Sequence, residues 1–402
     1  MITKLELIYL HKIKPYSDKL IGTLVAPFRK RGFNLLGYFD TPIGVAEVGR
    51  QCFLDLNKHS AFPSCIINFT LNTHGSTGFI KESPYKEKLK DKVKYSTNII
   101  FFNADYISDY IRSLSFAQGT RNVGVFWWEL EDYFYFKQGV DAVDEIIVFS
   151  DFVKQAIIKT FPAKRITKFS FPYSPGDFQL TPVPAVRKQY GLEPDDFVVF
   201  FNFDFFSVYE RKNPEGLAEA FSFAFKGNNK VKLLLKTIHA GNDNENYKKL
   251  RALLVKLKIE DQVIFEDKNL PKAELMSLIN ATDIYVSLHR SEGLGIGMME
   301  AMLLGKPVVA TAYGGNMEFT TKDTSLLVDY ELVEIDKDNG PYRKGYKWAN
   351  PDPADAAKKM ELLYKDPLEM ERLRNNALKH LKQFHQGGRF SMEVDAWINQ
   401  KV

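Results

Sequence analysis

The most constraining feature of this chain is a repeated alternation of short apolar runs with longer amphipathic stretches. The runs are rich in β-branched and aromatic residues. Such short, continuous apolar runs are typical of strands buried on both faces of a parallel sheet by crossover helices. The first series comprises Phe33–Phe39, Ser64–Thr70, Asn98–Ala104, Asn122–Trp128 and Glu145–Ser150. The second series comprises Phe197–Phe203, Val231–Ile238, Gln262–Asp267, Ile284–His289 and Val308–Thr311.

The two series predict an α/β protein of two doubly wound, Rossmann-like domains that face a central cleft. A chain of 402 residues is long enough for each domain to have its own core. Ser150 is a predicted helix cap ahead of Phe152–Thr160, and Asn213-Pro214 is a cap and first-position proline ahead of Glu215–Phe225. In such sheets ligands bind at the carboxyl ends of the strands, so we expect the functional residues there.

A proline-rich stretch separates the two series. Phe171–Val186 holds four prolines and one glycine, and it is the predicted interdomain linker. We therefore assign residues 1–175 to the first domain, residues 176–385 to the second, and residues 386–402 to a separate C-terminal helix.

Composition excludes several classes of protein. The net charge of +4 is too mild for a nucleic-acid-binding protein. Cys52 and Cys65 can form neither a disulfide framework nor a metal clip. The sequence shows no signal peptide and no apolar run near membrane-spanning length, so we expect a cytoplasmic protein.

The segment Asp283–Glu318 reads as strand, glycine-rich turn, helix and strand. Gly293, Gly295 and Gly297 let the backbone approach a ligand closely, and the following helix presents free N–H groups to it. These features indicate a pyrophosphate site. A nicotinamide fingerprint is excluded, because it needs Gly-x-Gly-x-x-Gly after a first strand.

Two acids bracket this turn. Glu292 ends the strand and Glu300 lies in the early helix, and each carboxylate can accept two hydrogen bonds from a sugar diol. The alternative is a purely structural turn whose acids are solvated or complement the helix dipole.

This pattern resembles the retaining GT-B glycosyltransferases of glycosyltransferase family 4, whose Glu-x7-Glu signature matches Glu292 and Glu300. The wider match comprises Asp283, Ser287, Gly293, Gly295, Ala301, Gly305, Lys306, Pro307, Val308, Gly314 and Gly315. The resemblance implies that Glu292 contacts the transferred sugar and Glu300 the ribose hydroxyls. It also implies that the amides of the loop hold the donor diphosphate, namely those of Leu294, Gly295, Ile296 and Gly297.

A basic pair follows the first strand of the second domain. Arg211-Lys212 resembles the pair with which the family holds the diphosphate and stabilises the leaving group; the alternative is a solvated surface pair. Lys236 ends another strand and is expected to face the cleft. Many relatives carry Gly-Arg where this chain has Asp204 to Ser207. Either Ser207 substitutes as a neutral donor, or Lys236 supplies the missing charge.

In the first domain, Gly44 lies in a loop that resembles the one approaching donor phosphate and acceptor, whereas Arg50 is expected to be structural. Two further strand ends supply acceptor or cleft candidates, which are Asn103, Asp105, Trp127, Trp128 and Glu129. The two tryptophans are equally compatible with a core position.

Many relatives carry a catalytic histidine in these first-domain loops, and this chain has none there. Asp105, Glu129 or neither then activates the acceptor. His289 is compatible with the core or the cleft.

The sequence around Trp127-Trp128 resembles a subgroup that builds cell-surface polysaccharides. The implied function is retaining transfer of a hexose from GDP-mannose or a UDP-sugar to a glycan or lipid-linked acceptor. The implied reaction needs no cofactor or metal. The alternatives are a sugar-nucleotide epimerase and a non-catalytic sugar-nucleotide-binding protein. The donor base is expected near Phe265–Lys268, and the C-terminal helix is expected to cross back to the first domain.

Peripheral membrane contact is a further expectation. Lys81–Lys94 holds six lysines against three acids, and Lys4–Arg31 is also basic and amphipathic. Anionic lipid attracts such segments; the alternative is a solvated helix face.

Overall fold

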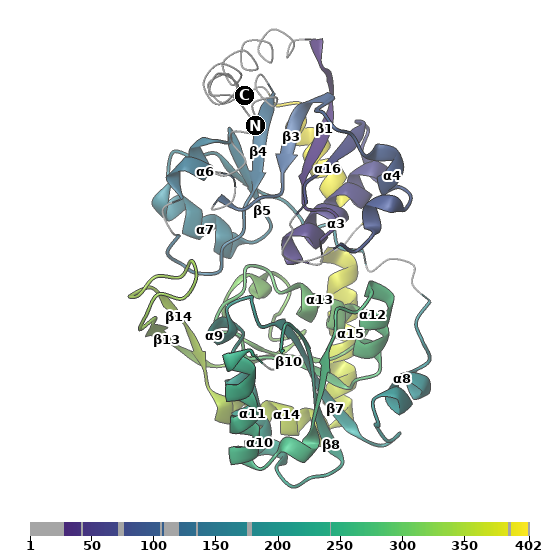
Figure 1. Ribbon diagram of the computed structural model, residues 1–402, viewed down its shortest axis with the longest axis vertical. Helices are drawn as coiled ribbons and strands as arrows, with labels where there is room; N and C mark the ends of the chain where they lie inside the picture. The colour runs from purple at the N-terminus through teal and green to yellow at the C-terminus, as the bar shows by residue number, and fades with distance from the viewer. Residues whose placement is uncertain are drawn as a thin grey trace, which may run out of the picture.

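The protein has two α/β domains, one above the other in Figure 1. The structure is a computed structural model. It describes residues 28–41, 43–70, 76–104, 107, 120–133, 136–174, 179–241, 243–384 and 387–400. Each domain has a six-stranded parallel sheet, which confirms the predicted pair of Rossmann-like domains.

The first sheet has the strand order β2-β1-β3-β4-β5-β6. Its strands are β1 (Lys30–Gly37), β2 (Ser64–Asn68), β3 (Tyr95–Ile100), β4 (Arg121–Val125), β5 (Glu145–Val148) and β6 (Ile166–Lys168). The predicted runs extend past several strand ends, because aromatic residues beyond them, such as Phe39, Phe101 and Phe126, leave the sheet and pack in the core. β6 was missed because it is short and only half-buried.

The second sheet has the order β12-β11-β10-β7-β8-β9. Its strands are β7 (Phe197–Asp204), β8 (Val231–Ile238), β9 (Val263–Asp267), β10 (Ile284–Ser287), β11 (Val308–Thr311) and β12 (Leu326–Val328). An antiparallel hairpin of β13 (Tyr330–Glu334) and β14 (Lys347–Pro351) follows. β13 is largely exposed and has no apolar run that would predict it.

Helices connect the strands and cover the sheets (Figure 1). Those up to β7 are α3 (Gly44–His59), α4 (Tyr85–Lys88), α6 (Lys137–Asp141), α7 (Asp151–Thr160) and α8 (Val183–Gln189), with the 3₁₀ helix η3 (Phe79–Lys81). Those after β7 are α9 (Tyr209–Lys212), α10 (Pro214–Phe225), α11 (Glu245–Leu257), α12 (Lys272–Asn280), α13 (Ile296–Leu303), α14 (Pro353–Lys365), α15 (Pro367–Phe384) and α16 (Arg389–Ile398), with the 3₁₀ helices η5 (Glu260–Gln262) and η6 (Gly315–Glu318).

Two predicted helix starts are confirmed by their caps. The Ser150 side chain accepts a hydrogen bond from the Val153 amide at the start of α7. The Asn213 side chain does the same for the Gly216 amide at the start of α10. Each cap satisfies an amide that has no partner within its own helix.

The predicted linker is too long. Its last residues, from Val183 onward, form the start of α8, so the irregular stretch ends at Pro182. Pro184 is accommodated because a proline in the first turn of a helix removes no intrahelical hydrogen bond. Residues 175–178 of this stretch lie outside the described residues.

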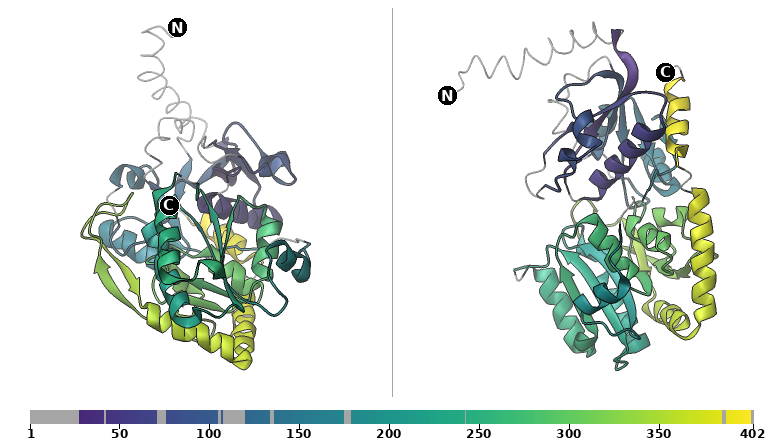
Figure 2. Two further views of the ribbon diagram at one scale, coloured as in Figure 1. Left: turned by 60° about the horizontal axis from the view of Figure 1, so that its bottom comes forward. Right: turned by 90° about the vertical axis from the view of Figure 1, so that its right-hand side faces the viewer.

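The end of the chain ties the two domains together. α15 runs along the second domain and α16 lies against the first (Figure 2). Asp55 on α3 accepts hydrogen bonds from the Ser391 amide at 2.9 Å and the Ser391 hydroxyl at 2.6 Å.

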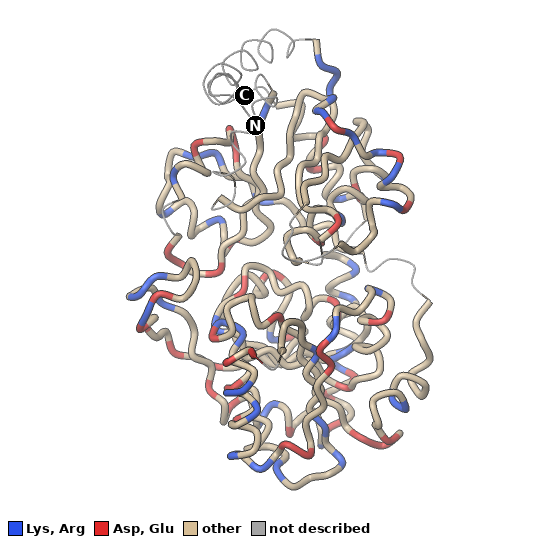
Figure 3. The backbone as a smooth tube through the Cα atoms, viewed as in Figure 1, with Lys and Arg blue, Asp and Glu red and all other residues tan. Residues whose placement is uncertain are grey.

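Charged residues of both signs are interspersed along the backbone of the two domains (Figure 3). Among the described helices, none has the length and apolar character needed to cross a bilayer.

Candidate functional site

The candidate site begins where β10 ends, on the side of the second domain that faces the first. The turn after β10 enters α13 through Gly295, which has a left-handed φ of +85°. The turn rests on a second glycine loop, in which the Gly315 amide donates to the Glu292 carbonyl at 2.6 Å. A Cβ at Gly315 would lie 1.8 Å from the Gly293 carbonyl oxygen. This close approach therefore requires glycine.

The first domain closes directly on this turn. The Ser150 hydroxyl, at the start of α7, donates to the Gly293 carbonyl at 2.9 Å. A Cβ at Gly293 would lie 3.1 Å from the Trp128 carbonyl oxygen. The amides from Leu294 to Gly297 thus lie at the start of α13 and beside the first domain, where a helix N-terminus favours an anionic ligand.

Glu292 is held by the predicted basic pair. Its Oε1 accepts a hydrogen bond from the ammonium of Lys212 and lies 3.3 Å from Nη1 of Arg211. Burial by itself raises the pKa of Glu292, but Lys212 and Arg211 together lower it from 4.5 to about 2. Two cations thus contact one oxygen of this carboxylate and are held at the end of β10, where they can pair with an anionic ligand.

The two basic residues are fixed by different means. Arg211 is buried and donates to the Ser291 carbonyl at 3.0 Å and the Ser207 hydroxyl at 3.0 Å. Burial lowers the pKa of Arg211, but Tyr342, Glu292 and Glu129 more than compensate and raise it. Burial lowers the pKa of Lys212, because Glu292 offsets the cost only in part. The structure therefore brings Arg211, Lys212, Ser207 and Glu292 together.

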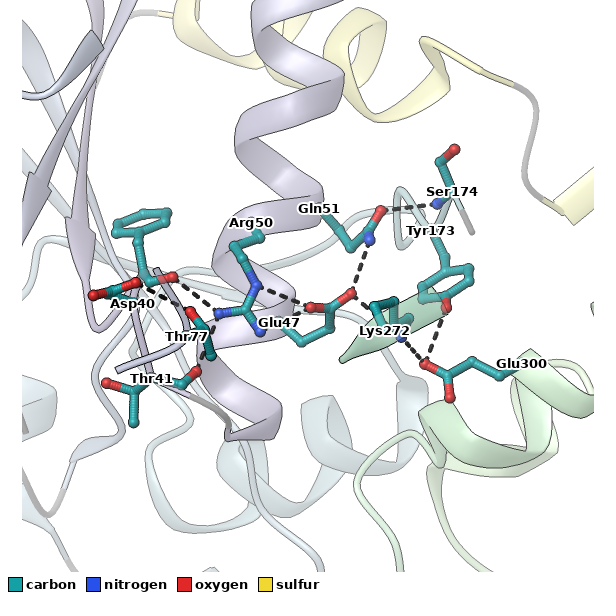
Figure 4. Close-up of polar contacts among 11 residues, drawn as sticks. Asp40, Thr41, Glu47, Arg50, Gln51, Thr77, Tyr173, Ser174, Lys272 and Glu300 are labelled. Atoms are coloured by element: carbon teal, nitrogen blue, oxygen red, sulfur yellow. Dashed lines mark hydrogen bonds and ion pairs between the residues drawn. The ribbon is translucent and has the colours of Figure 1, made fainter. Parts of the chain in front are cut away.

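Glu300 is buried on α13 and lies in a network that crosses both domains (Figure 4). Its Oε1 accepts a hydrogen bond from the Tyr173 hydroxyl at 2.9 Å and another from the ammonium of Lys272. Lys272 Nζ also lies 3.6 Å from Oε1 of Glu47 on α3 of the first domain. Among the described residues, Oε2 of Glu300 receives no hydrogen bond. That oxygen is available to a ligand.

The two tryptophan side chains are buried, which is the core position that the sequence also allowed. Trp127 is 9% exposed and stacks on Phe149, and Trp128 is 1% exposed. Both rings are large apolar surfaces whose burial stabilises the first domain.

Glu129, by contrast, is only partly buried at the domain boundary. Its Oε2 accepts a hydrogen bond from the Tyr342 hydroxyl at 3.0 Å. Tyr342 comes from the segment between β13 and β14 and packs in the apolar cluster of the first domain. The Glu129 carboxylate also contributes to the raised pKa of Arg211. Glu129 therefore lies close to the ion pairs of Glu292 with Arg211 and Lys212.

The remaining predicted residues are more scattered. Asn103 accepts a hydrogen bond from the Trp127 amide at 3.1 Å, so it orders the strand end. Asp105 lies outside the described residues. Gly44 is exposed at the start of α3, and a Cβ there would meet nothing within 4 Å. This glycine is therefore not required by contacts within the described protein.

Lys236 lies near the acids at the ends of β7 and β9. It is 8% exposed, and burial lowers its pKa, although Asp267, Asp204 and Glu266 oppose that shift. It contributes positive charge to the same sheet edge, but it forms no ion pair with Glu292 among the described contacts.

His289 takes the core position. It is fully buried, and its ring nitrogens contact the Ser287 hydroxyl at 2.9 Å and the Tyr313 carbonyl at 3.0 Å. Burial lowers the pKa of His289. Within the described residues, no group of three or more His, Cys, Asp or Glu side chains could hold a metal ion.

Sequence reasoning missed four residues that complete the site. Lys272 and Tyr173 contact Glu300, Glu47 contacts Lys272, and Tyr342 contacts Glu129. None lies in a motif, and each acts on a partner distant in the chain. The sequence feature closest to a signal for these residues is the position of Glu47. It follows Gly44 by three residues and pairs with Arg50, one helical turn further along the chain.

Comparison with known families agrees with this geometry. Residues 184–380 match the model of the family described as glycosyl transferases group 1. This match spans most of the second domain, which is therefore similar to the glycosyl transferases group 1 family. The matched residues include Arg211, Lys212, Glu292 and Glu300, and so contain both acids and the basic pair.

One curated protein is similar to this chain over more than half of its length. The chain is 27% identical over 262 residues to "Putative glycosyltransferase YtcC" of Bacillus subtilis (strain 168). That match spans 61% of this chain and 58% of the relative's length.

Two solved structures share the fold over most of the chain. The Anabaena HepE structure with UDP and glucose has a TM-score of 0.69 at 16% identity and covers 92% of this chain and 100% of that one. Sucrose-phosphate synthase from Thermosynechococcus elongatus has a TM-score of 0.62 at 14% identity and covers 92% and 98%. The two domains thus have the GT-B architecture.

Proposed function

We propose that this chain is a retaining glycosyltransferase that transfers a hexose from a nucleoside-diphosphate sugar to a glycan or lipid-linked acceptor. The observation that carries the proposal is the arrangement of the two acids around one helix start. Glu292 is paired with Arg211 and Lys212, and Glu300 is held so that one oxygen remains open. This arrangement offers cations for a diphosphate, Glu292 for the hydroxyls of a sugar, and Glu300 for the hydroxyls of a ribose.

Each part of the donor has a defined partner in this proposal. The diphosphate binds the amides at the start of α13 together with Arg211 and Lys212. The ribose hydroxyls donate to Oε2 of Glu300. The hexose hydroxyls contact Oε2 of Glu292, because both members of the basic pair contact Oε1.

The proposed transfer proceeds on one face of the sugar. The acceptor oxygen forms a bond to the anomeric carbon as the bond from that carbon to the diphosphate breaks, and a diphosphate oxygen takes the acceptor proton. Arg211 and Lys212 stabilise the negative charge that develops on the leaving group. Glu292 is a poor nucleophile for a double displacement, because two cations hold its charge.

UDP-sugars are the first donors to test. The Anabaena HepE structures contain UDP, glucose or UDP-glucose, and the fold is shared. GDP-mannose is the second donor class, on the resemblance of the region around Trp127-Trp128. Glu129 is the candidate group for orienting the acceptor hydroxyl, since Tyr342 fixes it beside Arg211.

The deciding experiment is a calorimetric screen of nucleoside diphosphates followed by donor turnover. We expect one nucleoside diphosphate to bind. The hexose of the corresponding sugar nucleotide should be hydrolysed slowly in water and transferred faster when an acceptor is added. Binding without sugar release would identify a non-catalytic binding protein, and a change of sugar configuration on the nucleotide would identify an epimerase. Proton NMR of fresh product should show the donor's anomeric configuration; the opposite configuration would refute same-face attack.

We further propose that the first domain contacts anionic membranes through the lysines of residues 81–94. Lys81, Lys86, Lys92 and Lys94 are exposed there, while most of Lys4–Arg31 lies outside the described residues. Co-sedimentation with anionic vesicles at moderate salt tests this, with neutral vesicles as the control. A protein that stays in the supernatant with both would rule it out.

A further inference from the structure

Lys272 lies between two carboxylates that belong to different domains. Glu300 is on α13 of the second domain and Glu47 is on α3 of the first. Lys272 Nζ donates to Oε1 of Glu300 and lies 3.6 Å from Oε1 of Glu47 (Figure 4). One lysine therefore contacts a carboxylate of each domain.

The surroundings fix both ends of this bridge. Glu47 accepts hydrogen bonds from Arg50 Nε at 3.0 Å and Gln51 Nε2 at 2.9 Å. Gln51 in turn accepts a hydrogen bond from the Ser174 amide in the linker at 2.9 Å. The neighbouring Tyr173 donates to Glu300, so hydrogen bonds join the linker, helix α3 and Glu300 in one network.

The charges in this network are strongly coupled. Burial raises the pKa of Glu47, but Lys272, Arg50 and hydrogen bonds lower it from 4.5 to about 2. Burial lowers the pKa of Lys272, but Glu300 and Glu47 together raise it above its usual value. The ammonium of Lys272 is shared between the two carboxylates, so each carboxylate reduces the share of the ammonium that the other receives.

We propose that Glu47 and Lys272 are positioning residues that couple ribose binding at Glu300 to closure of the two domains. The proposal rests on the function proposed above, in which Glu300 accepts the ribose hydroxyls. When the first domain moves away, Glu47 leaves and the ammonium of Lys272 pairs with Glu300 alone. That pairing competes with the ribose for the carboxylate.

Domain closure has the opposite effect. Glu47 draws the ammonium of Lys272 partly away, and Glu300 becomes a better acceptor for the ribose. Because coupling between two events is reciprocal, a ribose bound at Glu300 favours the closed arrangement by the same factor. The catalytic cleft is then assembled only when the donor is in place.

A matched pair of variants tests the coupling by calorimetry with UDP and 2′-deoxy-UDP, or the corresponding GDP ligands if only these bind. Glu47→Gln removes the charge that faces Lys272 and does not touch Glu300. Glu318→Gln is the control, because Glu318 also pairs across the domains, with Lys168 at 2.9 Å, but lies outside this network. We expect Glu47→Gln to weaken UDP binding roughly tenfold and to reduce the preference for UDP over 2′-deoxy-UDP. Glu318→Gln also removes an interdomain ion pair and can weaken both ligands equally, but it should leave the preference for UDP over 2′-deoxy-UDP unchanged.

A double-mutant cycle provides the second readout and guards against a variant that does not fold. Lys272→Met removes the ammonium that competes with the ribose for Glu300, so it should not reduce the preference for the ribose 2′-hydroxyl, and adding Glu47→Gln to it should have no further effect. Equal weakening of both ligands in Glu47→Gln, an additive double mutant, or the same loss of preference in Glu318→Gln would overturn the coupling and leave the proposed function intact. A wild-type protein that binds no nucleoside diphosphate would instead overturn the proposed function, and the coupling with it.

Discussion

Replacing Lys212 by methionine is the most informative single perturbation of the site. The substitution keeps the apolar stem and removes the ammonium that pairs with Glu292. If Lys212 stabilises the departing diphosphate, its loss should lower turnover by about a hundredfold or more, the scale seen when one stabilising donor of a developing charge is removed. That factor corresponds to about 2.7 kcal/mol in the activation barrier.

The same variant has a smaller, separate effect on stability. Removing one partner of a buried ion pair costs about 3–5 kcal/mol when the remaining charge has no other partner. Here Nη1 of Arg211 stays 3.3 Å from the same Glu292 oxygen. We therefore expect a loss of about 1–3 kcal/mol in the free energy of unfolding, which is below the cost for an unpaired buried charge.

Urea unfolding and steady-state turnover separate the two effects. Lys359→Met is the control, since Lys359 forms an ion pair with Asp355 on α14, away from the site. We expect Lys359→Met to retain turnover and Lys212→Met to lose it while remaining folded at the assay temperature. Normal turnover in a destabilised Lys212→Met protein would refute the role of Lys212 and make the pair a structural contact.

Three further predictions test other parts of the site. Glu300→Ala should weaken nucleoside-diphosphate binding by roughly 1.5–3 kcal/mol, the worth of hydrogen bonds to a charged group, and unchanged calorimetric affinity would remove Glu300 from the site. Gly315→Ala should destabilise the protein by about 1–3 kcal/mol, because its Cβ would lie 1.8 Å from the Gly293 carbonyl; an unaltered melting temperature would contradict this packing. The pKa values of Glu47 and Glu292 fall from 4.5 to about 2 in the folded protein, so their stabilisation is complete above pH 4.5 and is lost as the pH falls toward 2. Urea unfolding across this range should show a smaller pH dependence in Glu47→Gln than in the wild type.

The sequence alone determined the fold class and located the glycine-rich turn on which the candidate site is built. Apolar runs mark strands buried on both faces, and each predicted run overlaps a strand because continuous apolar character is a local property. The turn from Glu292 to Gly297 was identified for the same reason, since a glycine-rich loop and its helix are contiguous in the chain. The pairing of Glu292 with Arg211-Lys212 could be anticipated because both follow strands of one parallel sheet, whose carboxyl ends share an edge.

Only the tertiary structure decided which side chains the cleft receives. Trp127 and Trp128 follow a strand as cleft residues do, yet both are buried. The end of a strand shows where the backbone leaves the sheet, but it does not determine the direction of the side chains that follow. Glu47, Tyr173 and Lys272 carry no motif, because their role comes from contacts between two domains and the linker. Such contacts depend on how the domains pack, and packing is set by the whole surface of each domain rather than by any short segment.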